Sequence, residues 1–185
     1  STPIEETLRT LDDLVTQGKI RYFGCSNFSA WQVCESVWTS KELGIQTFIS
    51  AQPHYSMLER NVEQELIPFC GKYGVGILPY FPLANGFLTG KYRKNSPPPM
   101  GSRLEADNKG LFTEDNYALL EKLITFSEER GKTVLDLAFA WLLYNDDISS
   151  VIAGATKPEQ VISNADSADW QLTDNEYEEV TQFLP

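Results

Sequence analysis

The feature of this sequence that most constrains its fold is a regular alternation of short apolar segments with longer amphipathic ones. Apolar segments at 20–24, 47–51 and 75–80 begin 27 to 28 residues apart, and a segment with helical periodicity follows each of them. Short apolar runs bounded by turn residues indicate buried strands. Strands that alternate with helices form a parallel sheet, and this spacing is typical of the repeating units of a barrel.

The predicted helices begin and end at recognisable signals. Thr2 precedes Pro3 and Glu5, which predicts a helix that Thr2 caps and that Gly18 ends. Pro68 lies inside the third helical segment and predicts a kink there. The other predicted elements are helices at 29–43, 62–73, 113–129 and 133–144, a fourth strand at 149–153, a helix from Pro158 and a last helix capped by Thr173.

A long segment, 86–112, separates the third predicted strand from the helix at 113–129. It contains three consecutive prolines at 97–99 and shows neither helical nor strand periodicity. A segment of this length without secondary structure is usually functional or mobile, so we expect a long irregular loop there.

The opening helix has no strand before it, and four strands cannot close a barrel of eight. We therefore expect residues 1–185 to form a single domain that is N-terminally incomplete. The expected fold class is α/β, with parallel (β/α) units forming the C-terminal half of a TIM-type (β/α)8 barrel. The alternative is a small open α/β sheet that is complete as it stands.

Composition and charge exclude several classes of function. Hydrophobic residues make up 42% of the chain and charged residues 22%, as in ordinary soluble domains. The net charge of -11 argues against nucleic-acid and anionic-membrane partners, because both require a basic face. No run of 18 apolar residues occurs, and one histidine cannot build a His-rich metal site. Three cysteines without metal-ligand spacing are typical of a reduced, cytoplasmic protein.

Polar side chains follow the first two predicted strands. In parallel α/β folds, ligands bind at the carboxyl ends of the strands. Ser26 and Asn27 follow the first strand, and Gln52, whose amide can hydrogen-bond a carboxamide, follows the second. The alternatives are a turn or helix cap for Ser26 and Asn27, and a Gln52 that only satisfies loop backbone.

The two later strand ends offer an aromatic ring and an anion-binding turn. Tyr80 could stack on a planar ring, and Gly86 permits the tight backbone geometry that suits a pyrophosphate. The alternative is a core aromatic followed by an ordinary turn. Thr156 and Lys157 precede a helix N-terminus, whose N–H groups and dipole attract an anion. The alternative there is a plain turn with a solvated lysine.

Six segments occur in an order and at a spacing similar to those of one known family. They are 3–8, 18–28, 52–56, 80–84, 88–92, and Gly154-Ala155-Thr156 with Gln160 and Asn164. Together they resemble the aldo-keto reductases, and the 88–92 segment and the long loop are most similar to the branch of general bacterial reductases and potassium-channel β subunits. That resemblance implies an (α/β)8 barrel that binds NADP(H) without a Rossmann domain and reduces small carbonyl substrates, aldehydes and ketones, to alcohols.

The resemblance also implies roles for individual residues. Ser26, Asn27 and Gln52 would hold the nicotinamide carboxamide, and Tyr80 would stack on the nicotinamide ring. Phe81, Pro82, Leu83, Ala84 and Gly86 would line the pyrophosphate, and Lys91 and Arg103 would reach phosphates from the long loop. Gly154, Thr156 and Lys157 would take the 2′-phosphate, and Gln160 and Asn164 would face the adenine end.

The sequence departs from the family pattern in three places. Ser163 stands where the family often has Glu, which weakens the adenine contact, and Lys157 stands where many members carry Arg, a better fork for a phosphate. The family's catalytic Asp, Tyr, Lys and His precede the segment that matches Ser1, and nothing in this sequence replaces them. We therefore assign no catalytic residue and expect this truncated chain alone to be inactive as a reductase.

Two functions are compatible with these patterns. The first is the cofactor-binding part of a longer NADP(H)-dependent oxidoreductase. The second is a non-catalytic half-barrel that binds nucleotide or self-associates through its open sheet edges. Trp31, Phe87 and residues 111–112 could line an apolar substrate pocket, although packing at the surface or in the core is the alternative for each.

Overall fold

The computed structural model describes residues 2–185 and divides them into two compact units. The first, here called the sheet unit, comprises residues 2–54, 61–79 and 147–150. The second, here called the helical unit, comprises residues 55–60, 80–146 and 151–185. Each unit is therefore assembled from segments that lie far apart in the sequence.

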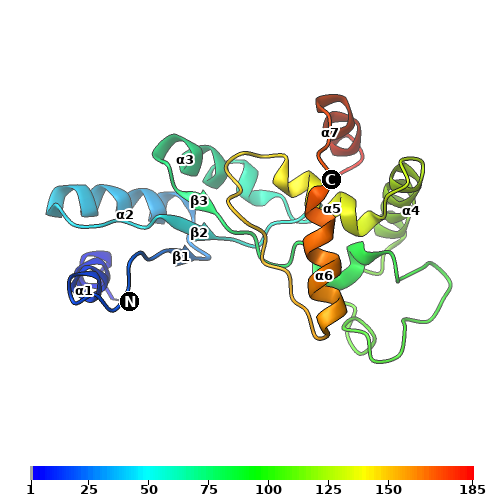
Figure 1. Cartoon of the computed structure of the whole chain (residues 1–185), viewed down its shortest axis with the longest axis horizontal. Coiled ribbons are helices and arrows are strands. Elements are labelled where there is room, and N and C mark those ends of the chain that lie inside the picture. The colour runs from blue at the N-terminus through cyan, green and yellow to red at the C-terminus, as the bar shows by residue number, and fades with distance from the viewer. Residues whose placement is uncertain (1) are drawn as a thin grey trace. The chain divides into compact units, whose positions relative to one another are not determined.

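Three short parallel strands form the centre of the sheet unit. They are β1 (Cys25–Ser26), β2 (Ser50–Gln52) and β3 (Gly76–Ile77), in the order β1-β2-β3 along the sheet (Figure 1). Ala51 of β2 pairs with Cys25 on one side and with Ile77 on the other. The predicted α/β class with a parallel sheet is confirmed.

The strands are shorter than the apolar segments that predict them. The segment 20–24 was predicted as a strand, but β1 begins only at Cys25. The backbone before β1 still runs against β2, because the Ile49 N–H donates to the Phe23 carbonyl at 3.0 Å. A Cβ at Gly24 would lie 2.6 Å from the Ser50 carbonyl oxygen, so this close approach requires glycine. Apolar composition therefore locates each sheet segment but not the residues that pair, and Tyr22 in the first segment is 66% exposed.

The fourth predicted strand, 149–153, is wrong as an extended strand in the described chain. Its neighbourhood makes two isolated bridges instead, Ile148 with Ile77 in the sheet unit and Ile152 with Tyr80 in the helical unit. Ile152 is 40% exposed, and the residues from 149 to 151 form no continuous ladder. Pairing therefore occurs at two points and is interrupted between them.

The first two helices of the sheet unit begin and end close to their sequence signals. The helix α1 (Ile4–Thr16) has Pro3 at its cap position, so it starts one residue later than the predicted cap at Thr2 implies. Gly18 has a φ of 69°, and its N–H bonds the Val15 carbonyl, which ends the helix as predicted. The helix α2 (Ala30–Leu43) is bounded by Ser29 and by the left-handed Gly44.

The third helical segment differs from its prediction around Pro68. Instead of one kinked helix over 62–73, a 3₁₀ turn η1 (Asn61–Glu63) is followed by α3 (Leu66–Tyr73). Pro68 is the third residue of α3, where an N–H group has no intrahelical partner in any case. The proline is therefore tolerated without a kink, and the break in the helix lies before it.

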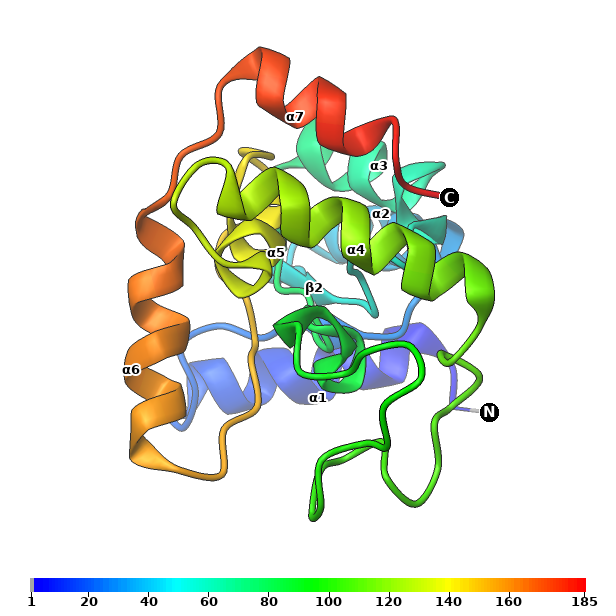
Figure 2. The same cartoon turned by 90° about the vertical axis from the view of Figure 1, so that its right-hand side faces the viewer.

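The helical unit is built from four α-helices and two 3₁₀ turns within residues 2–185 (Figure 2). They are η2 (Ala84–Thr89), α4 (Glu114–Glu128), α5 (Val134–Leu143), α6 (Pro158–Asp166), η3 (Ser167–Asp169) and α7 (Asp174–Thr181). Seven of the ten residues of α5 are buried, and its Trp141 is 1% exposed. The Trp141 indole N–H donates to the Thr181 hydroxyl at 3.0 Å, which ties α7 to α5.

The predicted loop 86–112 begins as the 3₁₀ turn η2 and is anchored by aromatic rings. Phe87 and Tyr92 stack with ring centroids 6.3 Å apart, and Phe112 lies 5.4 Å from Tyr92. Tyr117 of α4 completes this group, which we call the aromatic cluster, at 5.7 Å from both Phe87 and Phe112. The cluster joins the two ends of the long loop, which is the extended green segment of Figure 2.

The cap of α5 generates a stability prediction. The Thr133 hydroxyl accepts a hydrogen bond from the Asp136 N–H at 3.2 Å and donates to the Asp136 carboxylate at 2.8 Å. Thr133→Ala should lower the free energy of unfolding by about 1 kcal/mol, whereas Thr133→Ser should retain most of it. Urea denaturation at pH 7 measures both; equal values for the two variants would contradict the capping role.

Because the cap includes a carboxylate, the difference in unfolding free energy between wild type and Thr133→Ala should depend on pH. Burial opposes ionisation of Asp136, but hydrogen bonds from the Thr133 N–H and hydroxyl outweigh it and hold the pKa of Asp136 below its ordinary 3.8. A lowered carboxyl pKa adds stability above pH 3.8 and loses it as the pH falls through the native value. The gap in stability between wild type and Thr133→Ala should therefore narrow below pH 3.8.

Candidate functional site

The carboxyl ends of β1 and β2 bring together three of the predicted site residues. The Ser26 hydroxyl donates to the Gln52 carbonyl oxygen at 3.0 Å, and the Asn27 N–H donates to the same oxygen at 3.1 Å. Asn27 has a φ of 58°, in the left-handed region that few non-glycine residues adopt. Ser26 and Asn27 are exposed and Gln52 is half-buried, so this group is open to a ligand within the sheet unit.

A second group lies in the helical unit, in the turn that follows Tyr80. Phe81, Ala84 and Asn85 have φ values of 56°, 44° and 58°, and Gly86 has a φ of 91°. Side chains with β-carbons are strained in this region, and such residues gather at functional sites. The turn is closed by hydrogen bonds from Ala84 N–H to the Phe81 carbonyl at 2.9 Å and from Gly86 N–H to the Leu83 carbonyl at 2.8 Å.

Two cations of the long loop border this turn. The Arg103 guanidinium carbon lies 5.0 Å from the centroid of the Phe81 ring. A Cβ added at Gly86 would lie 3.4 Å from Nζ of Lys91, so the ammonium lies beside the turn. Within residues 2–185 neither Lys91 nor Arg103 pairs with a carboxylate, which leaves both positive charges available to an anion.

Rings of different exposure line the same turn. The Tyr80 and Phe81 rings meet edge to face at 5.1 Å, with Tyr80 half-buried and Phe81 37% exposed. Pro82 and Ala84 are buried beneath them, and Leu83 is half-buried. The turn therefore combines an accessible aromatic face with a closely packed, rigid backbone.

The third group surrounds the N-terminus of α6. The side-chain oxygen of Gln160 accepts three hydrogen bonds, from Thr156 N–H at 2.7 Å, from the Thr156 hydroxyl at 3.1 Å and from Lys157 N–H at 3.2 Å. The donors that the sequence assigns to a phosphate therefore converge on one point, where a neutral oxygen stands. An ionised oxygen accepts stronger hydrogen bonds and is favoured by the helix dipole. Gly154 is exposed and has no heavy atom within 4 Å of an added Cβ.

Asn164 lies one turn further along α6 and is half-buried, with Ser163 exposed beside it. The sequence motifs did not indicate that the Gln160 side chain would accept the hydrogen bonds of the Thr156 and Lys157 donors. A glutamine three residues after the cap of a helix is a recognised signal for this arrangement and could have indicated it.

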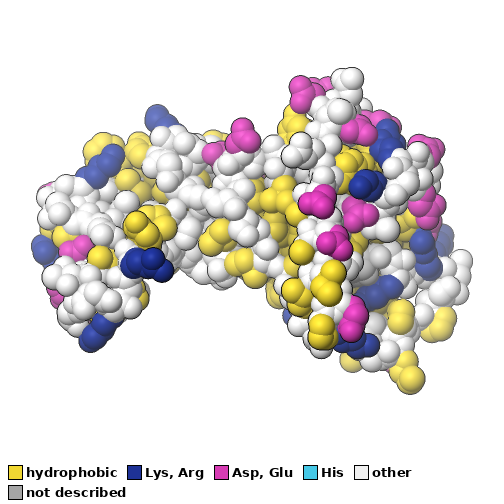
Figure 3. Space-filling view, viewed as in Figure 1, with side chains coloured by type: hydrophobic (Ala, Val, Ile, Leu, Met, Phe, Trp, Pro, Cys, Tyr) yellow, Lys and Arg dark blue, Asp and Glu magenta, His cyan; other side chains and the backbone are white. Residues whose placement is uncertain are grey.

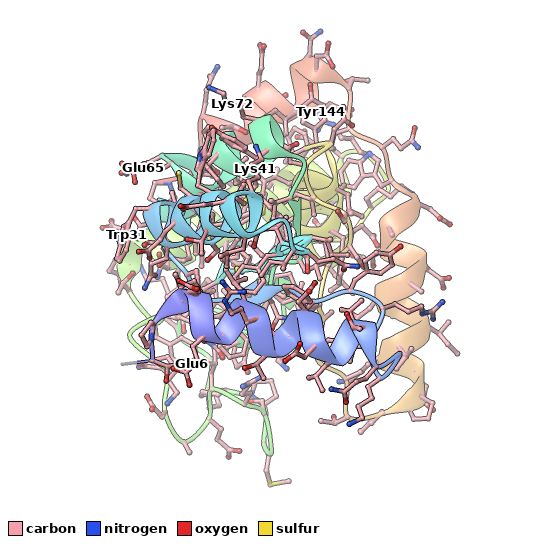
Figure 4. All side chains as sticks on the ribbon, turned by 90° about the vertical axis from the view of Figure 1, so that its left-hand side faces the viewer. Glu6, Trp31, Lys41, Glu65, Lys72 and Tyr144 are labelled. Carbon is pink, nitrogen blue, oxygen red and sulfur yellow. The ribbon has the colours of Figure 1, made fainter. Side chains whose placement is uncertain are left out.

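The buried thiols and the expected pocket residues add little to these groups. Burial raises the pKa of Cys25 to about 11 and that of Cys70 to about 12, so neither thiol is a nucleophile at neutral pH. Trp31 lies in the first turn of α2 and is 64% exposed (Figure 4), whereas Phe87 is fully buried in the aromatic cluster. Phe87 therefore packs in the core, and Trp31 lies at the surface of the sheet unit.

The described residues contain neither a cluster of metal ligands nor a membrane-spanning helix. Within residues 2–185, no group of three or more His, Cys, Asp or Glu residues could hold a metal ion. No helix in the same range combines the length and the apolar character needed to cross a bilayer.

The chain matches the sequence model of the aldo/keto reductase family over residues 1–185. A probable voltage-gated potassium channel subunit beta of Oryza sativa subsp. japonica is 36% identical over 175 residues, covering 91% of this chain and 53% of that protein. L-glyceraldehyde 3-phosphate reductase of Escherichia coli (strain K12) is 34% identical over 170 residues, covering 89% of this chain and 49% of that protein.

A second protein of Escherichia coli (strain K12), NADH-specific methylglyoxal reductase, is 35% identical over 177 residues, covering 94% of this chain and 51% of that protein. The chain spans about half the length of the curated relatives it matches. The family match extends over the whole sequence, and the parallel sheet with its flanking helices agrees with part of a (β/α) barrel. On these grounds the chain belongs to the aldo/keto reductase family.

Proposed function

We propose that this chain supplies the cofactor-binding half of an NADP(H)-dependent aldo-keto reductase that reduces aldehydes and ketones to alcohols. The observation that carries the proposal is the approach of Lys91 and Arg103 to the strained turn at 81–86. Neither cation has a carboxylate partner in the described residues 2–185. The chain has a net charge of -11, and an anion bound beside this turn would offset the charges of both Lys91 and Arg103. A pyrophosphate group is the anion that this family membership favours.

Each unit carries residues of the kinds that would contact a nicotinamide dinucleotide. In the sheet unit, Ser26, Asn27 and Gln52 offer the hydroxyl and amide groups that would hold a carboxamide. In the helical unit, Tyr80 would stack on the nicotinamide ring, and the turn from Phe81 to Gly86 would line the pyrophosphate with Lys91 and Arg103. When bound, the cofactor supplies the hydride for carbonyl reduction.

The N-terminus of α6 is the proposed site of the 2′-phosphate. Gly154, Thr156 and Lys157 would hold it, and an anionic oxygen would replace the Gln160 oxygen on three convergent donors. Gln160 and Asn164 would then face the adenine end. One relative is named as NADH-specific, so selectivity varies among similar proteins, and Lys157 is the side chain that favours NADP(H) here.

The chain's own residues would bind and orient the cofactor, and none of them is proposed to transfer the substrate proton. The acid and its partners would come from outside the segment that this chain matches. Reduction by the complete protein would therefore require groups beyond those described, and the 185-residue chain alone should bind nucleotide without turnover.

A non-catalytic half-barrel that self-associates is the second candidate. The observation that favours it is an exposed apolar surface on the helical unit, where Ile152, Val161 and Ile162 are 40%, 58% and 62% exposed. Figure 3 shows apolar side chains along α6 with acidic ones between them. Exposed apolar groups of this kind are often covered by a partner, and relatives named as channel subunits belong to assemblies by that name.

The contribution of the loop cations can be measured directly. Lys91→Met should weaken NADPH binding by about tenfold, because it removes a charge-assisted contact to a phosphate. Lys94→Met is the matched control, since Lys94 lies in the same loop but pairs with Glu114. Isothermal titration calorimetry of the 185-residue chain provides both constants. Equal affinities for the two variants would contradict the proposed pyrophosphate site.

The 2′-phosphate assignment makes a separate prediction. Lys157→Ala should reduce affinity for NADPH by about tenfold and change affinity for NADH by less than about twofold, because only NADPH carries the 2′-phosphate. The two nucleotides serve as controls for each other in the same titration. An equal loss for both would place Lys157 outside the 2′-phosphate site.

One further experiment separates the two candidate functions. We expect the purified chain to bind NADPH, to sediment as a monomer, and to oxidise no NADPH with a panel of aldehydes. A stable even-numbered assembly would favour the self-associating half-barrel instead. Turnover that is lost on Tyr80→Ala would show that the chain itself is a reductase and would refute the expected inactivity.

A further inference from the structure

We propose that Tyr92 is a positioning residue that holds both loop cations, Lys91 and Arg103, beside the turn at 81–86. The inference rests on the proposed function, because it concerns the same phosphate-binding groups. Tyr92 would touch neither the nucleotide nor the substrate. It would act through the backbone to which the two cations are attached and through its ring, whose centroid lies 5.2 Å from Nζ of Lys91.

A single buried hydrogen bond connects the two cation-bearing positions. The Tyr92 hydroxyl accepts from the Leu104 N–H at 3.2 Å, and Tyr92 and Leu104 are each 1% exposed. Lys91 directly precedes Tyr92, and Arg103 directly precedes Leu104. The bond therefore spans twelve residues of irregular chain and fixes the backbone next to each cation.

The Tyr92 ring is also packed against other side chains. It stacks on Phe87 at 6.3 Å and lies 5.4 Å from Phe112. Phe87 is fully buried and directly follows Gly86, the last residue of the candidate pyrophosphate turn. The aromatic cluster is thus continuous with the turn, and the hydrogen bond to Leu104 extends that rigid core to the far part of the loop.

Four cations of the long loop fall into two pairs with different neighbours. Arg93 and Lys94 form ion pairs with Glu121 and Glu114 of α4. Lys91 and Arg103 instead lie against Gly86 and Phe81, without a carboxylate partner in residues 2–185. This division leaves the second pair of charges for an external anion.

Long cationic side chains on an irregular segment lose much conformational freedom when they bind a phosphate. Fixing the backbone beside Lys91 and Arg103 in advance reduces that loss, which is the general basis of preorganised binding. In Tyr92→Phe the ring remains in the cluster, but the Leu104 N–H loses its acceptor. The loop around Arg103 should then become more mobile while the surrounding core stays packed.

A double-mutant cycle on the 185-residue chain tests the inference. NADPH dissociation constants are measured by calorimetry for wild type, for Tyr92→Phe, for the pair Lys91→Met and Arg103→Met, and for all three together. Tyr92→Phe should weaken binding about three- to tenfold in the wild-type background. In the background without the two cations it should weaken binding by less than about twofold.

Tyr117→Phe is the matched control. Tyr117 belongs to the same aromatic cluster, and within residues 2–185 its hydroxyl makes no hydrogen bond. The substitution should leave the NADPH dissociation constant within about twofold of wild type. Amide hydrogen exchange without nucleotide adds a second readout, in which Tyr92→Phe should accelerate exchange of the Leu104 N–H and Tyr117→Phe should not.

The outcomes separate this inference from the proposed function. If wild type binds NADPH but Tyr92→Phe weakens binding equally in both backgrounds, its effect is general loosening and the positioning role is refuted. If Tyr92→Phe leaves the amide hydrogen exchange of Leu104 unchanged, the hydrogen bond does not fix the loop, and the inference is refuted whether or not nucleotide binds. A wild-type chain that fails to bind NADPH overturns the proposed function and this inference together.

Discussion

The parallel pairing of β2 with both of its neighbours is the constraint on which the sheet unit depends. Ala51 pairs with Cys25 and with Ile77, so one short strand fixes the register of the whole sheet. Because parallel strands end at a common edge, the same pairing brings the side chains that follow β1 and β2 to one place. The Gln52 carbonyl, which accepts from both Ser26 and Asn27, is the visible result. The polar group at this edge is therefore a product of strand register.

Local signals predicted the helices well, and non-local pairing explains where prediction failed. Thr173 caps α7 as expected, and α4 begins within one residue of its predicted start, since such signals depend on residues within one turn. The strand at 149–153 was wrong because extended structure requires a partner along its whole length, which sequence periodicity does not report. The helix break near Pro68 was misplaced for a different, local reason, because a proline in the first turn of a helix costs no hydrogen bond.

In the candidate site, the residues were predictable from the sequence but the contacts that hold them were not. Strand-end logic and the family resemblance pointed to the residues that the structure groups at each edge and turn, and the family itself is confirmed. The links that hold those residues were not predictable, because the contact of Tyr92 with Leu104 joins positions twelve residues apart in a segment without periodicity. Left-handed Phe81 and Ala84 were equally invisible, since neither residue type favours that conformation.

The Gln160 oxygen at the start of α6 has a consequence for how tightly any anion could bind there. Three donors at this helix end are already satisfied by one side chain of α6, which begins at Pro158. An incoming phosphate would exchange with an internal competitor, so its affinity would reflect only the difference between a charged and a neutral acceptor. Such an exchange favours doubly charged groups over neutral or weakly polar ones. The three donors already point to one place, so the exchange would require the Gln160 side chain to move away from them.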